Sequence, residues 1–119
     1  GISGPEADQL LSKSGAGLLI EALQNNTFDR KPQIGTATYQ SWPTSKDWHI
    51  PTSWPVIRAF NFIRGVENWG IPFTLITKTN PLNVRSVVGF THEASTVGYR
   101  RINKHGKNEV GFSDGWLEF

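Results

Sequence analysis

The stretch of residues 54–79, WPVIRAFNFIRGVENWGIPFTLITKT, constrains the fold most, because aromatic and β-branched side chains crowd two adjacent runs. The runs cover residues 56–64 and 69–77, and the short segment between them contains Gly65 and Asn68. Two apolar runs that flank a break of this kind predict a β-hairpin.

The two runs of this hairpin differ in their patterns. The second run places four apolar side chains on one face at a period of two, which predicts a half-buried strand at the centre of a sheet: Trp69, Ile71, Phe73 and Leu75. The first run carries apolar groups on both faces. We therefore expect its strand to lie between two layers or to be buried against another subunit.

The composition favours a β-rich domain over a helical bundle. The chain has 119 residues, enough for one domain with a modest core. Hydrophobic residues make up 37% and aromatic residues 12%. Few aliphatic side chains beside many large rings are typical of a β domain with much exposed surface.

Charge and cysteine content exclude several classes of partner. The net charge is +2, and the basic residues are scattered rather than grouped in a run, so we expect no nucleic-acid partner. No apolar stretch approaches the roughly 20 residues of a membrane span, so we expect no membrane insertion. The chain has no cysteine, which excludes disulfides and thiolate metal sites.

The N-terminal part, residues 1–30, is expected to form a helical or stalk segment, and residues 31–119 a β domain. Leucines recur at roughly helical spacing, but the serines and glycines of residues 12–17 predict a break into short helical turns. Leu11 and Leu18 are one heptad apart, as at the end of a coiled coil. Since the chain also lacks methionine, we expect it to be the C-terminal piece of a longer protein.

Further strands are expected over residues 34–42, 84–91, 95–103, 110–112 and 116–119, with residues 104–108 as a polar hairpin loop containing Gly106. Residues 41–55 hold three prolines and three tryptophans, so this stretch cannot be a central strand. The predicted fold class is mainly β: a small antiparallel β-sandwich or meander of about six strands, with a short N-terminal helical or stalk segment.

No catalytic site is predicted. The three histidines fall in different predicted loops, and the sequence contains none of the common motifs for metalloproteases, nucleophilic serines or phosphate binding. His92 stands beside Glu93, but neighbours on a strand point to opposite faces and do not form a dyad. His92 is the one histidine that could bind an ion together with symmetry mates. We therefore expect no enzyme activity, no metal and no cofactor.

The aromatic residues are the stronger functional signal. Flat rings stack on the apolar faces of sugars, while polar side chains bind the hydroxyl groups. On this basis the predicted ligand-binding residues are Trp48, His49, Trp54, Asn68 and Trp69. The alternative is that these rings fill the core or a subunit interface, as tryptophans in β domains usually do.

The C-terminal half resembles a known family. A strand containing Tyr99, Arg100 and Arg101, then a polar loop with glycine, and then the final GWLEF resemble the small β domains at the ends of bacteriophage tail fibres and pyocin fibres. The resemblance covers about residues 34–119 and is one of pattern. It implies a homotrimer at the distal tip of a virion fibre that recognises a cell-surface glycan or an outer-membrane protein.

Three functions stay open at this point. The favoured function is host-receptor recognition by a trimeric viral or phage fibre tip. The first alternative is a structural or assembly domain of the same kind of particle, in which the aromatic residues pack inside. The second is a small enzyme, such as a glycan hydrolase or nuclease, which would need paired carboxylates brought together by the fold.

Overall fold

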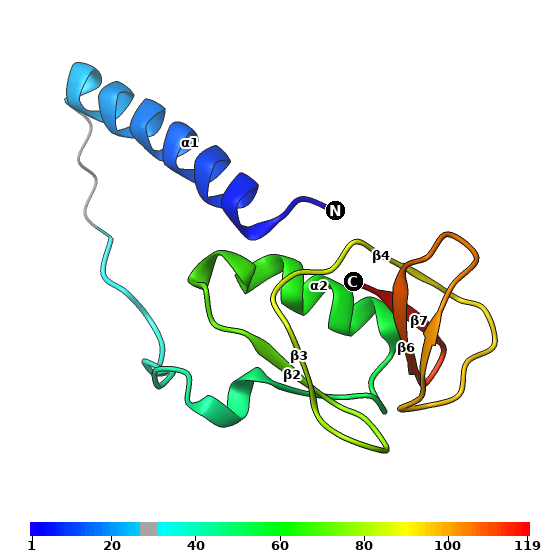
Figure 1. The fold of residues 1–119 in the computed structure, drawn as a ribbon. Helices are drawn as coiled ribbons and strands as arrows, with labels where there is room; N and C mark the ends of the chain where they lie inside the picture. Colours follow the sequence, from blue (N-terminus) through cyan, green and yellow to red (C-terminus); the bar gives the residue numbers. More distant parts are fainter. Residues whose placement is uncertain (27–30) are drawn as a thin grey trace.

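A long N-terminal helix and a mixed α/β body make up the fold. The computed structural model describes residues 1–26 and 31–119. After helix α1 (Gly4–Asn25), an extended arm of residues 31–44 leads to the 3-10 helix η1 (Ser45–Trp48). Figure 1 shows α1 extending away from the body, with its first turn nearest to α2 (Val56–Val66).

The body contains two small sheets and a second short helix. The first sheet has the strand order β1-β2-β3, with β1 (His49–Pro51) parallel and β3 (Leu82–Val84) antiparallel to β2 (Phe73–Ile76). The second sheet has the order β4-β7-β6-β5 and is antiparallel throughout. Its strands are β4 (Gly89–Thr91), β5 (Arg100–Ile102), β6 (Asn108–Phe112) and β7 (Gly115–Glu118).

One hydrophobic core joins both sheets through α2. Helix α2 contributes Val56, Ala59 and Ile63, all fully buried. The two sheets contribute the remaining fully buried members, which are Ile50, Phe73, Leu75, Val110, Phe112 and Leu117. Because the first sheet holds a parallel pair and α2 forms the crossover between β1 and β2, this half of the body is a small βαβ unit.

The predicted hairpin over residues 54–79 was wrong in its first half, because residues 56–66 form α2. The buried side chains of that run lie at Val56, Ala59 and Ile63, with half-buried Phe60 between them. These positions are i, i+3, i+4 and i+7, the spacing of one helix face. The apolar groups that seemed to occupy both faces of a strand therefore belong to one side of a helix, and neither explanation offered for a two-sided strand is needed.

The second half of that stretch was predicted better. β2 spans only Phe73–Ile76, but it is the middle strand of its sheet, as expected, and Phe73 and Leu75 are fully buried. The residues before it form the 3-10 helix η2 (Glu67–Trp69), which ends at Gly70 in the left-handed region with φ 74°. Trp69 is consequently not part of the strand face.

Several other predicted strands differ in the structure. Residues 34–42 form no strand and are exposed. Residues 84–91 are divided between β3 and β4, which belong to different sheets, and the strand predicted over residues 95–103 is reduced to β5. Seven strands occur among the described residues, and the fold is mixed α/β rather than mainly β.

The two antiparallel pairings of the C-terminal part were predicted correctly, although the strand before the first loop is shorter than expected. β5 and β6 pair antiparallel around the polar loop that contains Gly106, and β6 and β7 pair across the turn before Gly115. β1 is an edge strand, consistent with the proline content of its region.

The N-terminal segment differs from its prediction in continuity. α1 runs unbroken through Gly15 and Gly17 for 22 residues. Its N-cap is Ser3, whose backbone N–H and hydroxyl both donate to the Glu6 carboxylate, at 2.6 and 2.9 Å. The last residues of the predicted segment, 27–30, lie outside the described residues.

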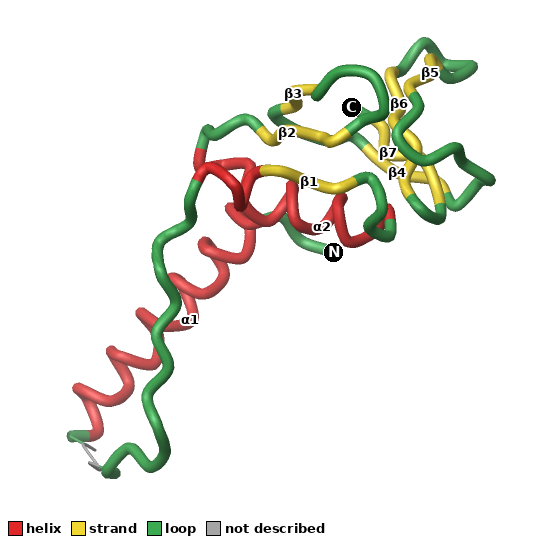
Figure 2. Tube along the Cα trace, turned by 90° about the horizontal axis from the view of Figure 1, so that it is seen from below, coloured by secondary structure: helices red, strands yellow, loops and turns green. Residues whose placement is uncertain are grey.

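The molecule is elongated because α1 and the arm project from the body. Its extents are 60 × 33 × 24 Å and its radius of gyration is 19.7 Å, whereas a compact domain of this length has about 13–14 Å. Figure 2 shows the arm returning the chain from the far end of α1 to the body. Both elements expose large apolar side chains, including Leu11, Leu18, Ile34 and Tyr39.

Candidate functional site

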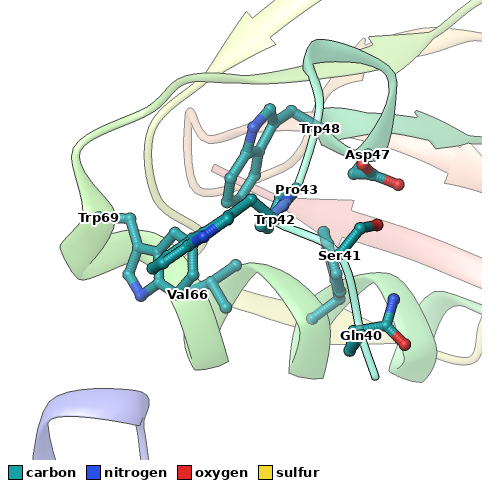
Figure 3. A pocket seen from close by; sticks show the side chains of 9 residues that line it. Gln40, Ser41, Trp42, Pro43, Asp47, Trp48, Val66 and Trp69 are labelled. Carbon is teal, nitrogen blue, oxygen red and sulfur yellow. The ribbon is translucent and has the colours of Figure 1, made fainter. Parts of the chain in front are cut away.

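A cavity lined mainly by apolar side chains, four of them aromatic, lies where the arm meets the body (Figure 3). It has a volume of about 440 Å³ and opens to solvent. Its walls come from the end of the arm, η1, the second half of α2 and η2. We call it the aromatic pocket, and its lining residues are Gln40, Ser41, Trp42, Pro43, Asp47, Trp48, Phe62, Val66 and Trp69.

Trp48 forms the fixed part of the pocket. It ends η1 and is only 8% exposed. Its ring makes edge-to-face contacts with Trp69 and Phe73, each with a centroid distance of 5.7 Å. Such contacts add to the energy of burying the ring, so Trp48 is anchored in the core while one part of it borders the pocket.

Trp69 and Trp42 form the open part of the pocket. Trp69 is 50% exposed and Trp42 is 85% exposed, although both line the same cavity. Figure 3 shows the indoles of Trp42 and Trp69 close to Val66, with the Trp48 ring above them in this view. Two large rings are therefore presented to solvent over a hollow, an arrangement that offers flat apolar surfaces to a ligand.

The polar groups of the pocket come from the arm and η1. Gln40 brings an amide, Ser41 a hydroxyl and Asp47 a carboxylate. Oδ2 of Asp47 accepts hydrogen bonds from the backbone N–H and the hydroxyl of Thr44, at 2.6 and 2.9 Å. The backbone bond first, and then the hydroxyl bond, hold the pKa of Asp47 below its ordinary value. The pocket thus presents an ionised acceptor together with groups that both donate and accept.

The five predicted site residues are only partly brought together. Trp48 and Trp69 meet in the aromatic pocket, but His49 and Asn68 are exposed and are not among its lining residues. Trp54 is half-buried elsewhere: its ring packs under the Arg58 guanidinium, with Cζ 3.9 Å from the centroid.

Trp54 also has a structural role in its backbone. Its carbonyl accepts hydrogen bonds from the N–H of Ser113 at 3.2 Å and from the hydroxyl of Ser113 at 2.9 Å. These bonds attach the segment before α2 to the turn between β6 and β7.

The pocket residues that the sequence did not predict are Trp42 and its polar neighbours Gln40, Ser41 and Asp47. The available signal was the tryptophan- and proline-rich composition of residues 41–55.

A second cavity, of about 480 Å³, lies over the second sheet and is polar. Glu109 faces it with a side chain only 3% exposed, and its Oε2 accepts from Nε of Arg101 at 2.6 Å. This hydrogen bond raises the pKa of Arg101. Asn103 Nδ2 donates both to Glu109 Oε1 and to Glu118 Oε2, each at 3.1 Å.

Glu109 and Glu118 both line this second cavity and share Asn103 as a hydrogen-bond donor, so their carboxylates lie close together. Paired carboxylates are what the enzyme alternative would require. However, each oxygen of Glu109 is already engaged, one by Arg101 and the other by Asn103. Arg101 is itself stacked on Trp116, with Cζ 3.9 Å from the ring centroid. The cluster is therefore best described as a polar network that joins β5, β6 and β7.

His92 lies close to Asp114. Its Nδ1 lies 3.3 Å from the carbonyl oxygen of Asp114 and 3.8 Å from the carboxylate oxygen Oδ2 of the same residue. Within residues 1–26 and 31–119, no three or more histidine or acidic side chains are grouped to hold a metal ion.

Comparisons with known proteins give no relative for this chain: no protein-family model, curated protein or solved structure matches it. Among the helices that the structure describes, none has the length and apolar character to cross a membrane.

Proposed function

We propose that this chain is the receptor-binding tip domain of a viral or bacteriophage fibre, located at the distal tip of the virion, and that it binds a cell-surface glycan in the aromatic pocket. In this proposal the protein is a homotrimer without enzyme activity. The observation that carries the proposal is the exposure of Trp42 and Trp69 over one cavity.

The chemistry of the pocket supports a saccharide ligand. The faces of Trp42 and Trp69 are apolar and flat, and a pyranose ring presents a matching apolar face through its C–H groups. Gln40, Ser41 and Asp47 supply donors and acceptors for hydroxyl groups. Binding sites for small ligands commonly combine an apolar wall with a few polar groups in this way.

The exposed side of α1 supports self-association. None of its residues is buried, and its large aliphatic side chains are 56–70% exposed: Leu10, Leu11, Leu18, Leu19, Ile20 and Leu23. A single helix of this kind is marginal in water, and packing is what usually stabilises it. Other copies of α1 would supply that packing, and three copies agree with the resemblance to fibre tips.

Replacing the exposed rings tests the proposal directly. We expect Trp42→Ala and Trp69→Ala each to weaken binding to host cells or to a glycan array by about 10- to 100-fold, because aromatic anchors of this type contribute about 1.4–2.7 kcal/mol. Because the Trp42 side chain is exposed and buries little apolar surface in the fold, Trp42→Ala should leave the melting temperature unchanged. Tyr39→Ala is the matched control, because Tyr39 is 95% exposed on the same arm but lies outside the pocket.

The same variants distinguish glycan binding from the alternative of a structural or assembly domain. If the rings serve only subunit contacts, Trp42→Ala will lower the mass in solution and leave no binding signal to lose. Trp48 is unsuited to this test, because its buried ring supports the core and its loss would destabilise the body. Failure of the unaltered protein to bind any host cell or glycan would contradict the proposed function.

A further inference from the structure

We infer that the aromatic pocket selects uncharged saccharides and rejects anionic ones such as sialylated or uronate-containing glycans. This inference rests on the proposed function and narrows its ligand class. It follows from the charges that line the cavity rather than from its aromatic rings.

The side chains that line the pocket carry negative charge but no positive charge. Asp47 is the one charged side chain among the nine described lining residues, and neither lysine, arginine nor histidine is present in that set. A protein site for a carboxylate ligand usually supplies a cation, most often an arginine that binds both oxygens. Among its lining residues the aromatic pocket offers an anionic ligand no such partner and one fixed negative charge. Lys46, the neighbour of Asp47 in η1, does not line the cavity.

The carboxylate of Asp47 is held in place. Both hydrogen bonds from Thr44 reach the same oxygen, Oδ2, and they fix the side chain within the first turn of η1. Neutralising Asp47 by protonation would weaken these bonds, so the negative charge persists at neutral pH. An anionic group brought into the cavity would meet this charge with little freedom for the carboxylate to move away.

Two arginines of the adjacent helix α2 are engaged elsewhere. The guanidinium of Arg58 lies over Trp54, at 3.9 Å from the ring centroid. The Arg64 guanidinium pairs with Glu6 of α1 at 3.9 Å and lies 5.5 Å from the ring centroid of Phe60. Neither arginine lines the pocket, so neither offsets the charge of Asp47 there.

The test uses a glycan array on which each sialylated or uronate-containing glycan stands beside its uncharged counterpart. The unaltered chain should bind uncharged members and should bind their anionic counterparts at least about fivefold more weakly, the effect of one close like charge near a surface. Asp47→Asn keeps an oxygen that can accept from Thr44 but removes the charge. We expect this variant to reduce the difference within pairs to about twofold or less.

Glu67→Gln is the matched control, because Glu67 begins the neighbouring η2 but does not line the cavity. It should leave the discrimination unchanged, and a cooperative thermal transition in both variants will show that the fold is intact. Equal or tighter binding of anionic members by the unaltered chain would overturn the inference while leaving the proposed function standing. An unchanged discrimination in Asp47→Asn would also overturn it. Binding to no member of the array would contradict both this inference and the proposed function.

Discussion

Asp114 accepts a hydrogen bond from the backbone N–H of Val56 at 2.7 Å, although 58 residues separate the two in the chain. Val56 is the first residue of α2, and Asp114 lies in the turn between β6 and β7. The residue before α2 is Pro55, which cannot provide a capping side chain. The carboxylate of Asp114 therefore performs the capping role from a distant strand turn, and it joins the helix to the second sheet.

Removal of this distant cap should destabilise the whole body. Asp114→Ala leaves the N–H of Val56 without its carboxylate partner, and we expect it to lower the free energy of unfolding by about 1–2 kcal/mol. Asp114→Asn retains an oxygen acceptor without the charge and should lower it by roughly half as much. Urea denaturation followed by tryptophan fluorescence measures both. If Asp114→Ala unfolds at the same urea concentration as the unaltered protein, the capping role is wrong.

The same turn constrains Gly115 sterically. A Cβ atom at this position would overlap the carbonyl oxygen of Thr91 and would lie 2.9 Å from Cγ1 of Val56. The close approach of β4, β7 and the start of α2 thus requires glycine here. This contact could not be predicted from the sequence, because the three segments come from residues far apart in the chain.

The polar network over the second sheet should contribute to stability rather than to catalysis. Glu109 is buried, and Glu109→Gln keeps its shape but replaces the ion pair with Arg101 by a neutral contact. We expect a loss of about 2 kcal/mol in the free energy of unfolding, the scale of a hydrogen bond to a charged group. Thermal denaturation of this variant should show a lowered melting temperature.

Glu93→Gln is the comparison for Glu109→Gln. Glu93 also binds Arg101, at 3.1 Å, but its side chain is 68% exposed. Exposed ion pairs contribute little, so this variant should differ from the unaltered protein by less than about 0.5 kcal/mol. Equal effects of the two substitutions would show that burial of Glu109 does not matter, contrary to the structural description.

The fold was predictable from the sequence where contacts are local. The hairpin from β5 to β6 has its polar loop within the sequence, and the β6–β7 turn is marked by Ser113, Asp114 and Gly115. The prediction was wrong around α2 because a short apolar run is compatible with the period of a helix and with the period of a strand. The decisive observation was that Val56, Ala59, Phe60 and Ile63 match a helix face, a pattern hidden by the bulky and β-branched character of the run.

The candidate site was predictable only in part for a related reason. The sequence shows that tryptophans are concentrated in residues 41–55, but it does not distinguish core rings from exposed ones. Trp48 packs against Phe73 because η1 turns it inward, whereas Trp42 stands on the arm without a strand to bury it. Trp69 joins them because η2, rather than β2, determines where its ring lies.

The pocket should be stable toward acid until Asp47 is protonated. The pKa of Asp47 is lowered in the folded state, so its stabilising contribution is complete above the unfolded pKa and is lost as the pH falls through the lower folded pKa. Ligand binding should therefore weaken through this group only below about pH 4. NMR titration of the Asp47 carboxyl carbon measures the pKa directly.

Variants of Thr44 test the cause of this shift. Thr44→Val removes the hydroxyl donor and keeps the backbone donor, which is the larger of the two causes. We expect the pKa of Asp47 to rise part of the way toward its ordinary value in Thr44→Val and to return in Thr44→Ser. A pKa that does not respond to the hydroxyl would contradict the described cap.

The last prediction concerns the proposed self-association through α1, whose large aliphatic side chains are exposed. Light scattering behind a sizing column should give three times the chain mass of 13.3 kDa for the unaltered protein. Leu11→Ser combined with Leu18→Ser removes two side chains one heptad apart, and this variant should elute as a monomer with reduced helical circular dichroism, since an isolated helix containing Gly15 and Gly17 is marginal. Gln9→Ser combined with Lys13→Ser is the polar control and should stay trimeric. A monomer with a fully formed α1 in the unaltered protein would contradict self-association, because the helix would then be stable without packing against other copies.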